Sequence, residues 1–305
     1  MGKAAFVTVD VFTQERFSGN PLAVFPDARG ISDDAMQKIA AEFGYSEITF
    51  VLPPQDPAHD ARVRIFTPTA EIPFAGHPNV GTAFVLGQES HLFGRAIGDV
   101  LRFEEKAGLV EVVLEREEAA VVGATIRAPQ PLTVGEMVPP EIILSCASLP
   151  DGAVRVDSHP PRVVSVGLPF VVAELSDLAS LARARPNLAA FGDAAKSHGP
   201  SPHDFSLFLY VRDSADPWHL RARMFAPLDN VLEDPATGSA SGALSAFLAD
   251  LDSAPDGAFH LTIEQGVEMG RRSLIAVTVD KLAGAVQEVR IGGRCVSVME
   301  GHISV

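Results

Sequence analysis

Three ionisable side chains stand where acid/base chemistry could be built. Glu47 precedes a predicted strand, His77 follows a glycine at a predicted helix start, and Asp234 lies in the loop before a second such helix. Each also has a plain structural interpretation, because a Glu at a strand edge is usually solvated and a His or Asp can simply complement a helix start. A carboxylate in a partly apolar cleft would instead have a raised pKa and could take a proton from carbon and return it elsewhere. The helix dipole would keep the imidazole of His77 neutral and able to form hydrogen bonds.

Two glycine-containing turns could bind an anion. Ala75-Gly76-His77-Pro78 and Thr237-Gly238-Ser239-Ala240 each lead into a run of small and apolar residues. Free N–H groups and the positive dipole end make a helix start attractive to anions, and glycine lets a ligand approach the backbone closely. The glycine of a single such turn usually serves only to form the turn and binds no ligand. Because the two turns fall at equivalent places in an internal repeat, we predict that they hold a small carboxylate.

The sequence contains an internal repeat whose two copies align without gaps. The pattern Arg-x-Arg-x-Phe-x-Pro occurs at residues 62–68 and again at residues 221–227. Two long copies of one unit favour two similar domains over a solenoid. Glu47 aligns with Ser206, and the loop that contains Asp234 is longer than its counterpart. The two copies therefore differ at two of the candidate catalytic residues.

The elements that would carry these residues are many short strands and a few helices. Residues 79–86 and 240–249 are apolar or small on nearly every face, which predicts helices that are buried all round. Ser32 and Gly44 are expected to cap a shorter amphipathic helix. We predict an α+β fold of two pseudo-symmetric domains, residues 1–125 and 126–292, each a β-barrel-like sheet wrapped around a central buried helix. The active site is expected between these domains.

Four segments of the chain resemble the signature of the phenazine-biosynthesis PhzF-like family. They are Asp10 to Val24, Tyr45-Ser46-Glu47, Ala75-Gly76-His77-Pro78 and Glu233 to Ala240. The resemblance implies the diaminopimelate epimerase-like fold, in which residues 293–305 could return to the first domain. It also implies a cofactor-free isomerase.

The same resemblance implies a role for each candidate residue. Glu47, His77 and Asp234 would be catalytic, with Glu47 as the carbon base. Gly76 and Gly238 would supply backbone donors, and Ser46 and Ser239 would contact the substrate.

One departure from related enzymes bears on the reaction. Two-base epimerases and racemases of the superfold that this chain resembles use a cysteine before the glycine at each helix start, where this chain has Ala75 and Thr237. We therefore expect proton transfer by Glu47 on one face of a cyclic or unsaturated carboxylate held between the two helix starts. The alternatives are a racemase or epimerase of a small amino or imino acid, or a non-catalytic metabolite-binding or interaction protein on the same fold.

The composition excludes several partners. Thirty-nine acidic and 24 basic residues give a net charge of −15, which disfavours nucleic acid and anionic membranes. The two cysteines show no metal-ligand spacing, and His198 and His203 are interpreted as part of a surface loop. We expect a cytoplasmic homodimer that acts on a small-molecule carboxylate without a cofactor or a metal.

Overall fold

A computed structural model describes residues 2–199 and 204–305 of the chain. The predicted surface loop of residues 198–203 is described only in part, because residues 200–203, which include His203, lie outside the described residues. The prediction is wrong for His198, which is the last residue of helix α5 (Leu188–His198). The chain divides into two compact units. Unit 1 comprises residues 1–127 and 292–305, and unit 2 comprises residues 128–291. The last strand, β19 (Ala285–Ser304), contributes residues to both units.

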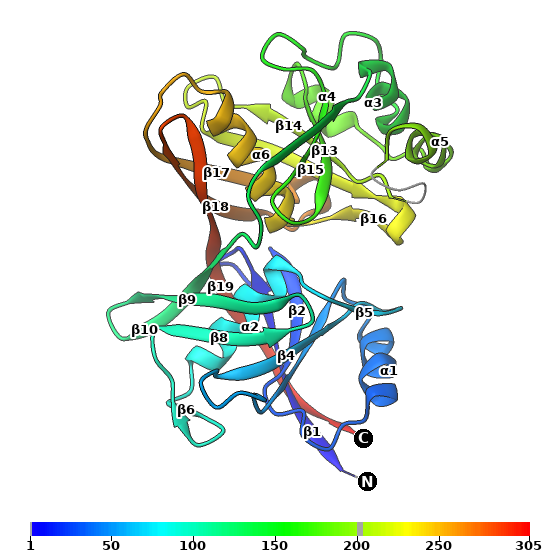
Figure 1. Cartoon of the computed structure of the whole chain (residues 1–305). Coiled ribbons are helices and arrows are strands. Elements are labelled where there is room, and N and C mark those ends of the chain that lie inside the picture. The colour runs from blue at the N-terminus through cyan, green and yellow to red at the C-terminus, as the bar shows by residue number, and fades with distance from the viewer. Residues whose placement is uncertain (1, 200–203) are drawn as a thin grey trace. The chain divides into compact units, whose positions relative to one another are not determined.

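Unit 1 is a closed sheet around one helix (Figure 1). Hydrogen-bonded neighbours follow the ring β19-β1-β2-β3-β4-β8-β9-β10, and β10 closes the ring on β19. The unit's elements before β19 are β1 (Lys3–Val11), β2 (Asn20–Phe25), α1 (Asp33–Phe43), β3 (Ile48–Leu52), β4 (Ala61–Phe66), β5 (Glu71–Ile72), α2 (Gly76–Gly87), β6 (His91–Leu92), β7 (Arg95–Ala96), β8 (Val100–Glu105), β9 (Gly108–Glu117) and β10 (Ala120–Arg127).

Helix α2 fills the interior of this ring. All of its residues are buried, as its lack of a polar face predicts. Small residues allow the close approach: a Cβ on Gly81 would lie 2.6 Å from the Leu22 side chain and 2.7 Å from that of Val11. The polar Thr82 is buried with a partner, since its hydroxyl lies 2.7 Å from that of Thr49 on β3. Helix α2 is thus packed closely against the strands around it.

Unit 2 has a comparable sheet around α6. Its strands pair in the order β11-β12-β13-β14-β15-β17-β18, with β16 added to β15. The elements of this unit are β11 (Thr133–Met137), α3 (Pro140–Ala147), β12 (Arg162–Ser165), β13 (Pro169–Glu174), α4 (Leu178–Arg183), α5 (Leu188–His198), β14 (Leu207–Arg212), β15 (His219–Ala226), the 3-10 turn Pro227–Asp229, β16 (Val231–Asp234), α6 (Gly238–Leu251), β17 (Gly257–Gln265), the 3-10 turn Val267–Met269 and β18 (Ser273–Leu282).

The two units repeat one pattern of strand directions. In unit 1, β2 runs parallel to β3, β3 is antiparallel to β4, and β4 is parallel to β8. In unit 2, β13, β14, β15 and β17 follow the same sequence of directions. The predicted α+β fold of two pseudo-symmetric barrel-like domains, each around a buried helix, is confirmed.

Local signals in the sequence explain several helix ends. Ser32 accepts a hydrogen bond from the Ala35 amide, and Gly44 ends α1 in the left-handed region, as predicted. Helices α2 and α6 begin at Gly76 and Gly238, earlier than the predicted residues 79 and 240. Within the described ranges 2–199 and 204–305, no helix combines the length and apolarity needed to cross a membrane.

Candidate functional site

Glu47 and His77 lie against each other in unit 1. Glu47 directly precedes β3, and His77 is the second residue of α2. The distance from Glu47 Oε2 to His77 Nε2 is 3.5 Å, and the two side chains are 18% and 6% exposed. This separation is longer than an ordinary hydrogen bond. The carboxylate and the imidazole are therefore close enough to act on the same group without being tightly bonded to each other.

A short polar chain orients the imidazole. Asn20 is fully buried at the start of β2, and its Nδ2 lies 3.4 Å from His77 Nδ1. The Ser46 hydroxyl lies 3.4 Å from Asn20 Oδ1, which fixes the amide with its nitrogen towards the histidine. An amide nitrogen can only donate, so this arrangement makes Nδ1 the acceptor and leaves the ring proton on Nε2. The Nε2–H group then faces Glu47.

Burial keeps His77 uncharged. Removal from water lowers the pKa of the imidazole from 6.5 to about 3. The contact with Glu47 is accordingly one between a neutral ring and a carboxyl group near neutral pH, rather than an ion pair. A ring with so low a pKa is a poor base but a serviceable hydrogen-bond donor.

Asp234 is part of a buried ring of polar groups in unit 2. Its Oδ2 accepts a 2.5 Å hydrogen bond from the hydroxyl of Thr237, the N-cap of α6. Gln265, at the end of β17, accepts from the Thr237 amide at 3.0 Å and donates to the Asp234 carbonyl at 2.7 Å. Gln265 Nε2 also lies 3.1 Å from the Thr237 hydroxyl oxygen, so that hydroxyl is committed to donate to Asp234. The side chain of Asp234 is thereby held in one direction.

The two buried helices begin without a side-chain cap. Ala75 and Thr237 are the N-cap residues of α2 and α6, and neither makes a capping hydrogen bond through its side chain. The surface helices α1, α4 and α5 are capped by Ser32, Asp177 and Asn187. Gly76 and Gly238 are buried at the first positions of α2 and α6, whereas Ser239 is partly exposed. Helix α3 also begins without a side-chain cap, at Pro139, but among the described α-helices only α2 and α6 combine the missing cap with a buried glycine at the first helical position. That combination leaves backbone N–H groups open to close approach by an anion.

The predicted residues gather at these two helix starts. Ser46, Glu47, Gly76 and His77 lie at or beside the start of α2, and Asp234, Gly238 and Ser239 lie at or beside the start of α6. Sequence reasoning missed two side chains of this set, Asn20 and Gln265. Asn20 belongs to one of the quoted signature segments, which could have drawn attention to it, whereas nothing local marks Gln265. Among the residues that the structure describes, no group of three or more His, Cys, Asp or Glu side chains is arranged to hold a metal.

Comparison with known families gives a match over nearly the whole chain. The model of the phenazine biosynthesis-like protein family matches residues 9–301. An isomerase of Pseudomonas aeruginosa, trans-2,3-dihydro-3-hydroxyanthranilate isomerase, is 36% identical over 97% of this chain and 98% of its own. An uncharacterised isomerase of Mesorhizobium japonicum is 35% identical over 98% of both chains.

Solved structures give the same result. The phenazine biosynthesis protein of the PhzF family from Bacillus anthracis covers 100% of both chains at 27% identity, with a TM-score of 0.88. The full coverage in both directions means that no large element of that fold is missing here.

Proposed function

Because this chain belongs to the phenazine biosynthesis-like family and is an isomerase, we propose that it moves a proton within a small unsaturated carboxylate by general acid/base catalysis. Glu47 is the base. It takes a proton from one carbon of the substrate, the electron pair of that C–H bond shifts into the adjacent unsaturated system, and Glu47 returns the proton to another carbon. Such a transfer leaves the sum of atoms and electrons unchanged and needs no cofactor. The contact between Glu47 Oε2 and the buried His77 ring carries this proposal.

His77 acts in this proposal as a donor and not as a second base. With the pKa of its imidazole at about 3, it does not take the proton that Glu47 has acquired. Its Nε2–H group instead offers a hydrogen bond to the Glu47 carboxylate or to the substrate while charge develops. Ser46 supports that geometry through Asn20.

The starts of α2 and α6 supply the groups that hold the substrate. We infer that backbone N–H groups at Gly76 and Gly238 bind carboxylate oxygens, since neither N-cap residue, Ala75 or Thr237, caps its helix with its own side chain. Ser239 adds a hydroxyl contact, and Asp234 is a second catalytic carboxylate, which contacts the substrate but does not take the proton from carbon.

Reaction through two thiols is disfavoured by where the cysteines lie. Cys146 is buried in α3 and Cys295 in β19, and burial raises the pKa of both thiols, that of Cys146 to about 12. Neither helix start carries a cysteine, because Ala75 and Thr237 are the N-cap residues. This supports proton transfer by one carboxylate over racemisation by a pair of thiols.

The test begins with the compound that the Pseudomonas aeruginosa relative is named for, trans-2,3-dihydro-3-hydroxyanthranilate, followed by a panel of unsaturated and cyclic carboxylates. Each is incubated with the purified protein in D2O and followed by proton NMR. We expect one member of the panel to be converted to an isomer with deuterium at a single carbon. Binding of a panel member without exchange or isomerisation would refute the proposed reaction.

A further inference from the structure

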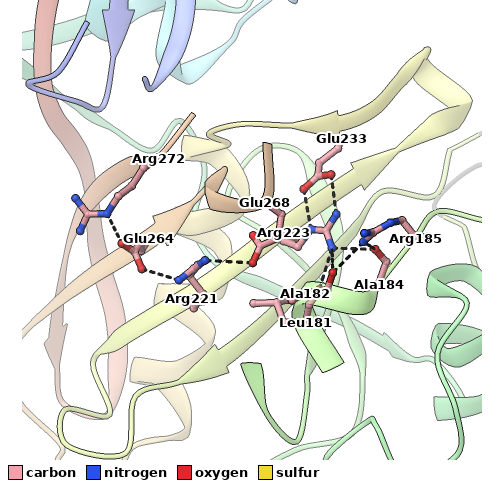
Figure 2. Close-up of polar contacts among 10 residues, drawn as sticks. All are labelled: Leu181, Ala182, Ala184, Arg185, Arg221, Arg223, Glu233, Glu264, Glu268 and Arg272. Carbon is pink, nitrogen blue, oxygen red and sulfur yellow. Dashed lines mark hydrogen bonds and ion pairs between the residues drawn. The ribbon is translucent and has the colours of Figure 1, made fainter. Parts of the chain in front are cut away.

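Arg223 and Glu233 form a buried, two-pronged ion pair directly beside Asp234 (Figure 2). Arg223 Nε donates to Glu233 Oε1 at 2.7 Å, and Nη2 donates to Oε2 at 2.8 Å. The Arg223 side chain is 3% exposed and that of Glu233 is 17% exposed. A bidentate guanidinium–carboxylate pair fixes both distance and direction, so Glu233 has one preferred orientation.

The third nitrogen of Arg223 ties the pair to the end of helix α4. Nη1 donates to the carbonyl of Ala184 at 2.8 Å and to that of Leu181 at 2.9 Å, both at the C-terminal end of α4 (Figure 2). A helix C-terminus carries partial negative charge and favours a cation. The guanidinium also lies over the Phe225 ring, 4.9 Å from its centroid. Every nitrogen of this buried guanidinium therefore has a hydrogen-bond acceptor, and one of its faces contacts an aromatic ring.

Strand geometry connects the pair to Asp234. Glu233 and Asp234 are consecutive residues of β16, and β16 pairs with β15 so that Asp234 lies opposite Met224. Successive side chains of a strand point to opposite faces. While Arg223 holds Glu233 on one face, Asp234 must point to the other, where its carboxylate meets Thr237.

We propose that Arg223 is a positioning residue that acts through Glu233 to aim the Asp234 carboxylate at the start of α6. This inference rests on the proposed function for its catalytic meaning, since Asp234 is the second carboxylate of that proposal. The pair itself is a feature of the fold that can be tested without a substrate.

Unit 1 contains an equivalent arginine–glutamate pair, but no acidic residue follows its glutamate. Arg64 donates to both oxygens of Glu71, each at 2.8 Å, and lies over Phe66 at 5.1 Å from its centroid. Glu71 is followed by Ile72. The repeated pair thus belongs to the common framework, and only in unit 2 does it orient a catalytic candidate.

The direct test is the crystal structure of Glu233→Gln. The Gln amide nitrogen would face an arginine donor, so only one of the two hydrogen bonds can persist. We expect β16 to shift so that Asp234 Oδ2 moves out of hydrogen-bond reach of the Thr237 hydroxyl. The matched control is Glu268→Gln, which weakens the neighbouring pair with Arg221 but lies outside β16. A Glu233→Gln structure with the Asp234–Thr237 contact unchanged would overturn the inference.

Kinetics on trans-2,3-dihydro-3-hydroxyanthranilate, or on the panel member that is converted, give a second readout. A misaimed carboxylate should lower kcat by roughly 10- to 100-fold and change KM little, whereas Glu268→Gln should keep both. In an Asp234→Asn background, Glu233→Gln should cause no further loss of kcat, because the group that it positions is already disabled. A further loss as large as in the wild-type background would count against the inference.

These results separate the inference from the proposed function. If Asp234→Asn alone keeps full activity, the catalytic role of Asp234 fails, while the crystal structure still decides whether the pair aims the side chain. If Glu233→Gln does not fold, Glu233→Asp keeps the charge, shortens the side chain and is subject to the same two readouts.

Discussion

The starts of α2 and α6 have the same framework and different chemistry. Both helices are buried and lack side-chain caps, and both follow a short strand held by an arginine–glutamate pair. At α2 the polar groups are a carboxylate and a neutral imidazole, Glu47 and His77. At α6 they are a carboxylate, a hydroxyl and an amide, from Asp234, Thr237 and Gln265.

This difference indicates which positions to attribute to function. Residues that recur in both copies, such as Arg64 and Arg223, stabilise the hairpin that leads to each helix. Residues that occur in one copy only, such as Glu47, which aligns with Ser206 in the repeat, are not needed for the shared framework. Substitution of equivalent positions in the two copies tests this distinction between framework and function.

The largest expected effect is that of Glu47→Gln against Ser206→Ala. Glutamine keeps the shape of Glu47 but cannot accept a proton, so we expect kcat to fall by at least about 10²- to 10⁴-fold while ligand binding survives. Ser206→Ala alters the equivalent residue and should leave kcat within a few-fold of wild type. The measurement is the single-turnover rate with ligand affinity. A Glu47→Gln protein with a near-normal rate would remove Glu47 from the mechanism and leave Asp234 as the base.

The second effect concerns the two arginine–glutamate pairs. Arg223→Met leaves the partly buried Glu233 without its guanidinium and removes a buried cation from the end of α4, which should cost about 3 kcal/mol in the free energy of unfolding. Arg64→Met should cost less, about 1–2 kcal/mol, because Glu71 keeps Lys106 at 2.7 Å. Urea denaturation of both variants checks the order. Equal losses would mean that the two pairs do not differ in energetic importance.

A third prediction uses the neutral His77. Because burial lowers the pKa of its imidazole to about 3, the unfolded chain gains a proton below pH 6.5 that the folded chain does not. This contribution to stability is present above pH 6.5 and is lost as the pH falls towards 3. Relative to His77→Gln, the wild type should lose about 2 kcal/mol between pH 7 and pH 5, at roughly 1.4 kcal/mol per pKa unit. Parallel pH dependences of the two proteins in urea titrations would contradict the buried neutral ring.

The fourth prediction concerns Glu105, which has the opposite pH dependence. Burial raises the pKa of this carboxyl group to about 8, and Asn79 in the first turn of α2 lies against it. The folded chain keeps a proton that the unfolded chain loses above pH 4.5, so stability falls as the pH rises towards 8. Glu105→Gln should remove about 2 kcal/mol of that loss between pH 6 and pH 8. If the variant and the wild type lose the same stability over this interval, Glu105 is ionised in the folded protein.

Features with a local cause could be predicted from the sequence. The caps of α1 at Ser32 and Gly44, and the two helices with apolar or small residues all round, follow from neighbouring residues alone. The internal repeat alone predicts that the two units are similar.

Contacts between distant residues could not be predicted in this way. Gln265 meets Thr237 only because β17 pairs with β15, and Asn20 meets His77 across a wide separation in the chain. Glu233 could have been interpreted as an acid that complements the helix start, but it is paired with Arg223 instead. Tertiary packing, and not local preference, decides such partners.

The most direct test of a single-carboxylate reaction follows a labelled hydrogen in one turnover. The panel member that the protein converts is prepared with deuterium on the carbon that loses its proton and is mixed with excess wild-type protein in H2O. Because Glu47 is mostly enclosed beside His77, we predict that part of the product carries that deuterium on the receiving carbon, and that Glu47→Gln forms almost no product. Product without any transferred deuterium from the wild type, together with ordinary turnover by Glu47→Gln, would contradict the account.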